Sequence, residues 1–218
     1  FMLNILDRDL FLYLNQNLHN GSFDLFFSFI TSIGNFQLIL AILAIWILWK
    51  GNSHQRLSLL FLIISLMLAE SLNNTFKELI GRIRPCWALE GVRLLVGKTD
   101  SFSFPSGHAT NVFAAATVIA YEFRKNKWIT CSVILLAVLV AYSRIYVGVH
   151  YPFDILGGML LGITSSVCVL AFNKHYTLII SGEGTPNKRI SYFSLFIQVA
   201  VLVTAFRLSY IAAFKHAL

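Results

Sequence analysis

The chain has 218 residues, of which 57% are hydrophobic and only 12% are charged, and its mean hydropathy is +0.71. These values exclude an ordinary soluble domain and indicate a membrane protein. The formal net charge is +7, but the basic residues are scattered among apolar segments, which favours an anionic lipid or anionic substrate over nucleic acid. Three cysteines (Cys86, Cys131 and Cys168) have no paired spacing, so no disulfide framework is expected.

Residues 1–34 mix charged and apolar side chains too closely for a membrane span. They predict interfacial helices that are broken near Asn20 and Gly21. No basic stretch followed by a cleavable apolar segment opens the chain, so we expect no signal peptide. Phe1 ahead of Met2 looks like an added residue, and we expect the chain to be close to full length.

Six apolar runs then approach or exceed the roughly 20 residues that a spanning helix needs. The sequence therefore predicts an all-α fold, a polytopic membrane helical bundle that forms a single domain over residues 1–218. The expected transmembrane helices lie at about 35–49, 56–76, 106–123, 128–147, 153–173 and 193–213.

The connections at 50–56, 124–127 and 173–189 are polar and basic, and they fall on one side if the spans alternate. Basic residues are equally numerous on the opposite side. Three of them, Lys77, Arg84 and Arg144, are set aside here because a chemical role explains their position. The remaining bias favours the cytoplasm for these connections and the outer side for both termini.

The first of three unusual segments on that outer side is KELIGRIRP, residues 77–85. Lys77 and Arg84 are two helical turns apart, so a helix leaving the second span would place both on one face before Pro85 stops it. A planar guanidinium and a mobile ammonium suit a phosphoryl group. Alternatively, both side chains mark a membrane edge and reach toward water.

The second segment is SFPSGH, residues 103–108, at the start of the third span. Ser106 is a candidate N-cap, and the free amides of Gly107 and its neighbours would then form an anion site. His108 falls in the first turn and faces the same space. A helix cap beside an interfacial histidine is the simpler alternative.

The third segment is SRIYVGVHYPFD, residues 143–154. Asp154 lies four residues after His150, so its carboxylate can accept the imidazole N–H and leave the other ring nitrogen free for a substrate. Arg144 would add a third cation. Asp154 could instead be a favourable charge at the start of the fifth span.

The three segments together predict phosphoryl transfer through a phosphohistidine, in which His150 attacks phosphorus and His108 protonates the leaving oxygen. The cations and helix-start amides would stabilise the transition state without a cofactor. Two alternatives are a metal site built from two histidines and Asp154, which the nearby cations disfavour, and Ser106 as nucleophile with His108 as base.

These segments resemble the signature of the type-2 phosphatidic acid phosphatase superfamily: Lys, six residues, Arg-Pro; then Pro-Ser-Gly-His; then Ser-Arg, five residues, His, three residues, Asp. The match covers roughly residues 77–158 and has no departure; the matching residues are Lys77, Arg84, Pro85, Pro105, Ser106, Gly107, His108, Ser143, Arg144, His150 and Asp154. The resemblance implies a metal-independent membrane phosphatase on a helical bundle, with the second histidine as nucleophile and the first as acid.

The resemblance also implies a lipid phosphate substrate, such as undecaprenyl diphosphate, a lipid A phosphate, phosphatidylglycerol phosphate or phosphatidic acid, and a pocket on the outer face of a bacterial plasma membrane. Arg93 and Lys98 could contact a headgroup or be ordinary loop charges. Glu70, beside Asn73 and Asn74, could orient Lys77, line the lipid entrance or serve a structural hydrogen bond. A lipid-phosphate carrier or flippase on the same fold is the alternative function, and the expected partners are membrane lipids.

Overall fold

The computed structural model describes residues 2–17, 20–32 and 34–180. Within these ranges all regular structure is helical and no strand occurs, which confirms the predicted all-α fold. The expected helix at 193–213 lies outside the described residues, so the single-domain interpretation of the whole chain stays a prediction. The helices are α1 (Met2–Asn17), α2 (Gly21–Thr31), α3 (Gly34–Lys50), α4 (Ser53–Ile80), α5 (Pro85–Ala88), α6 (Gly107–Glu122), α7 (Lys127–Tyr146) and α8 (Pro152–Ile180).

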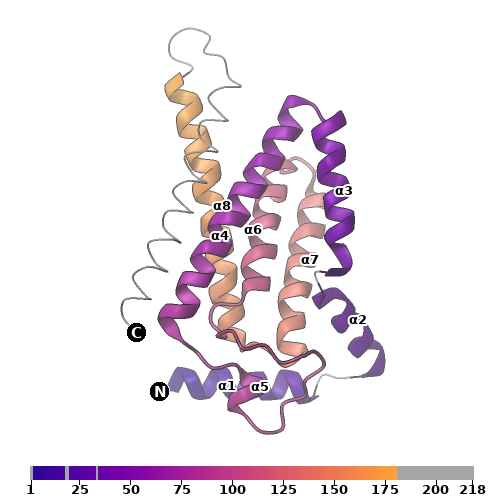
Figure 1. The fold of residues 1–218 in the computed structure, drawn as a ribbon, viewed down its shortest axis with the longest axis vertical. Helices are drawn as coiled ribbons and strands as arrows, with labels where there is room; N and C mark the ends of the chain where they lie inside the picture. Colours follow the sequence, from indigo (N-terminus) through magenta and orange to yellow (C-terminus); the bar gives the residue numbers. More distant parts are fainter. Residues whose placement is uncertain (1, 18–19, 33, 181–218) are drawn as a thin grey trace.

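The N-terminal helices lie at the foot of the bundle, where α1 runs across the ends of the longer helices (Figure 1). The predicted break between them is confirmed. Asn20 is the N-cap of α2, and its side chain accepts a hydrogen bond of 2.8 Å from the backbone N–H of Phe23. The interfacial location of these two helices stays a prediction.

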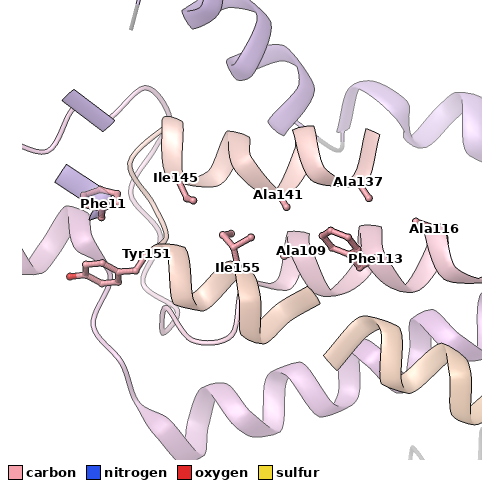
Figure 2. Close-up of a cluster of buried hydrophobic side chains, with 9 residues drawn as sticks. All are labelled: Phe11, Ala109, Phe113, Ala116, Ala137, Ala141, Ile145, Tyr151 and Ile155. Carbon is pink, nitrogen blue, oxygen red and sulfur yellow. The ribbon is translucent and has the colours of Figure 1, made fainter. Parts of the chain in front are cut away.

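Helix α6 lies at the centre of the bundle and packs against α4, α7 and α8 (Figure 1). Small residues allow this close packing. Figure 2 shows Ala137 and Ala141 of α7 facing Ala109 and Phe113 of α6. On the other side, a Cβ added to Gly158 of α8 would lie 2.5 Å from the carbonyl oxygen of Ser106, so only glycine fits there.

Three stretches are long and apolar enough to cross a membrane, namely Ser53–Ala88, which contains α4 and α5, Lys127–Tyr146 and Pro152–Ala171. They agree with the predicted spans at 56–76, 128–147 and 153–173. Helices α3 and α6 coincide with the predicted spans at 35–49 and 106–123, but with 17 and 16 residues they are shorter than the roughly 20 residues of a typical span.

Two expectations about helix ends are wrong. Lys77 and Arg84 do not share a helix, because α4 stops at Ile80 and Gly81 adopts a left-handed conformation, with φ 61°, that ends it. Residues 173–180, predicted to begin a loop, continue α8 to Ile180, since no glycine or proline interrupts the sequence there.

Candidate active site

The three unusual segments meet at the end of the bundle that α1 crosses (Figure 1). Residues 77–85 contain the last turn of α4 and the start of α5. Residues 103–108 lead into α6, and residues 143–154 join α7 to α8. The last connection turns at Gly148, whose φ is +87° and whose added Cβ would lie 2.6 Å from the carbonyl oxygen of Arg93. The turn returns the chain so that the backbone N–H of His150 donates to the carbonyl of Arg144 at 3.3 Å.

His150 is almost completely buried, with 1% of its surface exposed, and its two ring nitrogens face different groups. Nδ1 lies 3.4 Å from Oδ2 of Asp154, and Nε2 lies 3.0 Å from Nη1 of Arg84. A guanidinium can only donate, so Nε2 must be the acceptor and carries the lone pair. Burial lowers the pKa of His150 to about 3 despite the opposing effect of the Asp154 hydrogen bond, so the ring is neutral near pH 7.

The Asp154 carboxylate is held by donors from several elements and is 0% exposed. Oδ2 accepts from the Ser103 hydroxyl at 2.5 Å and from the backbone N–H of Tyr151 at 2.9 Å. Oδ1 accepts from Nη1 of Arg82 at 2.7 Å. These bonds fix the carboxylate beside His150, as the four-residue spacing predicted.

Arg82 and Asp7 are site residues that sequence reasoning missed. Nη2 of Arg82 donates to Oδ2 of Asp7 at 2.6 Å, so one guanidinium joins α1 to Asp154. The other oxygen of Asp7 accepts from the backbone N–H of Phe153 at 2.9 Å, at the start of α8. Burial raises the pKa of Asp7, and the hydrogen bonds from Phe153 and Arg82 oppose this rise. Arg82 lies within the first segment, but no sequence pattern predicts its contact with Asp7, which is 75 residues away.

Two of the predicted cations are buried and are held by the loop before α6. Nζ of Lys77 donates to the carbonyl of Phe102 at 2.6 Å. Nε of Arg84 donates to the carbonyl of Ser101 at 2.7 Å, and its Nη2 donates to the Ser101 hydroxyl at 2.8 Å. Lys77 lies within α4, whereas Arg84 follows the C-cap of that helix. The loop before α6 nevertheless holds both cations at the site.

Arg144 and His108 both contact Thr31, the last residue of α2. Nη1 of Arg144 donates to Oγ1 of Thr31 at 2.5 Å, and Nε2 of His108 lies 3.1 Å from the Thr31 carbonyl oxygen. The Nε atom of Arg144 is buried and has no hydrogen-bond partner within the described part of the chain. Thr31 was not predicted from the sequence.

The start of α6 has the predicted form. Ser106 is the N-cap and its hydroxyl accepts from the backbone N–H of Ala109 at 3.5 Å, so Gly107 and His108 lie in the first turn. Asn73 of α4 supports this turn, because its amide donates to the Thr110 hydroxyl at 2.9 Å. The helix start is therefore fixed from the neighbouring helix.

The arrangement suits an oxyanion. The charges of Arg84 and Arg144 act on both histidines, and the charge of Lys77 also acts on His108. Free amides at the start of α6 add donors on the same side. A neutral imidazole with a directed lone pair thus stands among cations and hydrogen-bond donors.

The three expected headgroup contacts make internal contacts. Arg93 forms an ion pair with Asp24 of α2, which raises the pKa of Arg93. The ammonium of Lys98 lies 4.2 Å from the ring centre of Trp87. Glu70 accepts hydrogen bonds from two amide side chains, those of Asn74 at 3.2 Å and Asn111 at 2.8 Å. Their role toward a headgroup stays a prediction.

A metal centre would need several ligands at one point. Within the residues that the structure describes, no group of three or more His, Cys, Asp and Glu side chains could hold a metal ion. His108 bonds to a carbonyl of α2, whereas His150 and Asp154 bond to each other and to arginines. The donor set thus does not fit a two-histidine, one-carboxylate metal site.

The sequence matches the PAP2 superfamily over residues 58–178. An undecaprenyl-diphosphatase of Sulfolobus acidocaldarius is 34% identical over 134 residues, covering 62% of this chain and 63% of that protein. A lipid A 4'-phosphatase of Bacteroides thetaiotaomicron is 31% identical over 169 residues, covering 73% of this chain and 73% of that protein. Phosphatidylglycerophosphatase B of Bacillus subtilis is 41% identical over 47% of this chain and 52% of its own length.

Two solved structures share the fold. The crystal structure of Aquifex aeolicus LpxE superposes with a TM-score of 0.65 and 31% identity, over 75% of this chain and 93% of that chain. The transmembrane PAP2 type phosphatidylglycerolphosphate phosphatase from Bacillus subtilis superposes with a TM-score of 0.63 and 29% identity, over 80% of this chain and 87% of that chain. The chain is an integral membrane protein that belongs to the PAP2 superfamily.

Proposed function

We propose that the protein is a metal-independent membrane phosphatase that hydrolyses a lipid phosphate or diphosphate through a phosphohistidine. The observation that carries this proposal is His150, a buried neutral imidazole whose Nδ1 faces Asp154 and whose Nε2 lone pair faces the Arg84 guanidinium. The family membership and the phosphatase names of the relatives support a lipid phosphatase activity.

In the first step, Nε2 of His150 attacks the phosphorus atom, and the bond from phosphorus to the leaving oxygen breaks. The Arg84 N–H that faces Nε2 in the free protein moves to a phosphoryl oxygen. His108 gives its proton to the leaving oxygen, while Asp154 stabilises the positive charge on the phosphorylated imidazole.

In the second step, water attacks phosphorus, His108 accepts its proton, and the bond from phosphorus to Nε2 breaks, which releases inorganic phosphate and restores His150. Lys77, Arg84 and Arg144 balance the charge that spreads over the phosphoryl oxygens in both steps. The backbone amide of Gly107, which follows the N-cap Ser106, adds a donor at the helix start.

The proposed substrates are undecaprenyl diphosphate, a lipid A phosphate or phosphatidylglycerol phosphate, which the names of the relatives include. We place the enzyme in a bacterial inner membrane, as the family resemblance implies, with its site on the periplasmic face, which the charge bias favours. Arg93, Lys98 and Glu70 remain candidates for headgroup contacts.

The test is release of inorganic phosphate from a panel of these lipids by purified protein in detergent. The His150→Ala variant should release none and form no acid-labile phosphoprotein during a rapid quench. A matched variant, Thr117→Val in the middle of α6, removes a hydroxyl that bonds the Phe113 carbonyl and should remain active. Binding of a lipid phosphate without release by the unmodified protein would instead favour a carrier or flippase.

Two further treatments separate the chemical alternatives. EDTA should leave phosphate release unchanged, whereas loss that a divalent ion restores would indicate a metal mechanism. Ser106→Ala should still form the phosphoprotein, because the Ser106 hydroxyl is buried as the cap of α6. Loss of the phosphoprotein in that variant, with His150→Ala retaining it, would make Ser106 the nucleophile.

A further inference from the structure

Thr31 lies at the point where helix α2 enters the candidate site. It is 4% exposed, and its two oxygen atoms contact two different residues of the site. The carbonyl oxygen is 3.1 Å from Nε2 of His108, and Oγ1 is 2.5 Å from Nη1 of Arg144. Thr31 lies outside residues 58–178, the part that matches the superfamily. One residue of an N-terminal helix therefore touches both a histidine and a cation of the site.

The contact with the carbonyl decides the tautomer of His108. A carbonyl oxygen can only accept a hydrogen bond, so Nε2 of His108 must carry a proton in the neutral ring as well as in the charged one. The other nitrogen, Nδ1, has no hydrogen-bond partner among the described residues. The nitrogen that gains and loses a proton is consequently Nδ1, and the Thr31 carbonyl does for His108 what Asp154 does for His150.

The contact with the hydroxyl fixes Arg144. Lys77, Arg82 and Arg84 each donate to at least one backbone carbonyl or carboxylate, whereas the Thr31 hydroxyl is the single hydrogen-bond partner of the Arg144 guanidinium within the described part of the chain. A buried guanidinium with one neutral partner keeps most of its donors for an incoming anion. The hydroxyl thus orients the group without neutralising it.

Helix α2 is held firmly enough to position Thr31. Asp24 pairs with Arg93 and accepts a hydrogen bond of 2.6 Å from the Tyr146 hydroxyl. One turn later the Phe27 ring packs on Tyr146, with ring centres 4.5 Å apart. Tyr146 belongs to α7, and Arg93 belongs to the loop before α6. Helix α2 is therefore fixed to elements that also carry the site.

We propose that Thr31 is a positioning residue for phosphoryl transfer. Its carbonyl keeps His108 as the Nε2–H tautomer so that Nδ1 handles the proton of the leaving group, and its hydroxyl aims Arg144 at the phosphate. The inference rests on the proposed function and deepens it, because it assigns the acting nitrogen of His108 and adds α2 to the site.

The hydroxyl is tested by Thr31→Val, which keeps the shape and removes the acceptor, beside Thr31→Ser, which keeps the acceptor. Losing a hydrogen bond to a charged group should lower kcat/KM about 10- to 100-fold in the valine variant, mostly through kcat. It should also weaken the binding of orthovanadate measured by calorimetry. The serine variant should stay within about threefold of the unmodified protein. Equal losses in both variants, or none in the valine variant, would overturn the role of the hydroxyl.

The carbonyl is tested by nitrogen NMR of protein labelled with 15N-histidine, with His108→Gln used to assign the signal. We expect the neutral Nε2–H tautomer of His108, and the same tautomer in Thr31→Val because that variant keeps the carbonyl. The Nδ1–H tautomer would overturn the assignment. Neither the NMR nor the vanadate measurement needs turnover, so they stay informative if no lipid phosphate is hydrolysed, a result that would count against the proposed function alone.

Discussion

Replacing Arg82 with Met should destabilise the protein strongly, because this guanidinium joins two buried carboxylates. Its two terminal nitrogens lie 2.7 Å from Asp154 and 2.6 Å from Asp7, and both Asp side chains are 0% exposed. Removing one partner from a buried ion pair costs about 3–5 kcal/mol, since a charge is left without compensation. Because 22% of the Arg82 side chain is exposed and water screens part of the interaction, we expect the lower end, about 3–4 kcal/mol.

For a chain of this size that loss corresponds to a fall in Tm of about 6–16 °C, at about 2–4 °C per kcal/mol. Thermal unfolding can be followed in micelles with a thiol-reactive dye. A background with Cys131→Ser and Cys168→Ser leaves the buried Cys86 as reporter, since the other two cysteines are exposed. The matched control is Arg8→Met, an exposed arginine on α1, which should change Tm little.

The double variant Arg82→Met/Asp7→Asn should recover about half of the loss. The amide in place of the Asp7 carboxylate still offers an oxygen to the backbone N–H of Phe153 and removes one of the two unpaired charges. The reasoning fails if the single variant melts within about 2 °C of its parent, or if the double variant melts no higher than the single one.

The remaining predictions concern pH and the packing of α6 on α8. Burial lowers the pKa of His150 to about 3 from about 6.5 in the unfolded chain, so its contribution to stability is complete above pH 6.5 and is lost as the pH falls below that value. The Tm of His150→Gln should accordingly fall less than that of the unmodified protein between pH 6.5 and 4.5. The raised pKa of Asp7 acts in the opposite direction, but equally in both proteins. Parallel Tm curves for the two proteins would contradict the role of His150. Gly158→Ala should lower phosphate release at least about tenfold, because its Cβ would meet the Ser106 carbonyl at 2.5 Å and displace the start of α6. Gly97→Ala, with nothing within 4 Å, should be silent, and equal activity of the two variants would refute the packing argument.

The motif residues were predictable because their chemistry is local. The spacing of His150 and Asp154 put a carboxylate one turn from an imidazole, and Ser106 ahead of an apolar run predicted a helix start. The long apolar runs predicted the helices of the bundle for the same reason, since hydrophobic length is a property of a single segment.

Contacts between distant segments could not be read in this way. Asp7 and Arg82 are 75 residues apart, and Thr31 and Arg144 are 113 residues apart, so no periodicity connects them. The path from Lys77 to Arg84 was wrong because Gly81 ends α4, although the loop still delivers both cations. The sequence thus predicts which residues meet at the candidate site better than it predicts the contacts that hold them there.

Helix α2 turns Leu25 and Phe26 outward, 77% and 46% exposed, while its last residue holds Arg144. In a bilayer such apolar side chains are covered by acyl chains or by the glycerol region. If α2 lies in the membrane interface, as the sequence predicts, lateral pressure and bilayer thickness act on a helix whose last residue contacts His108 and Arg144. The surrounding lipid would then influence the geometry of the candidate site as well as supply the substrate, and a rate measured in micelles would depend on the detergent.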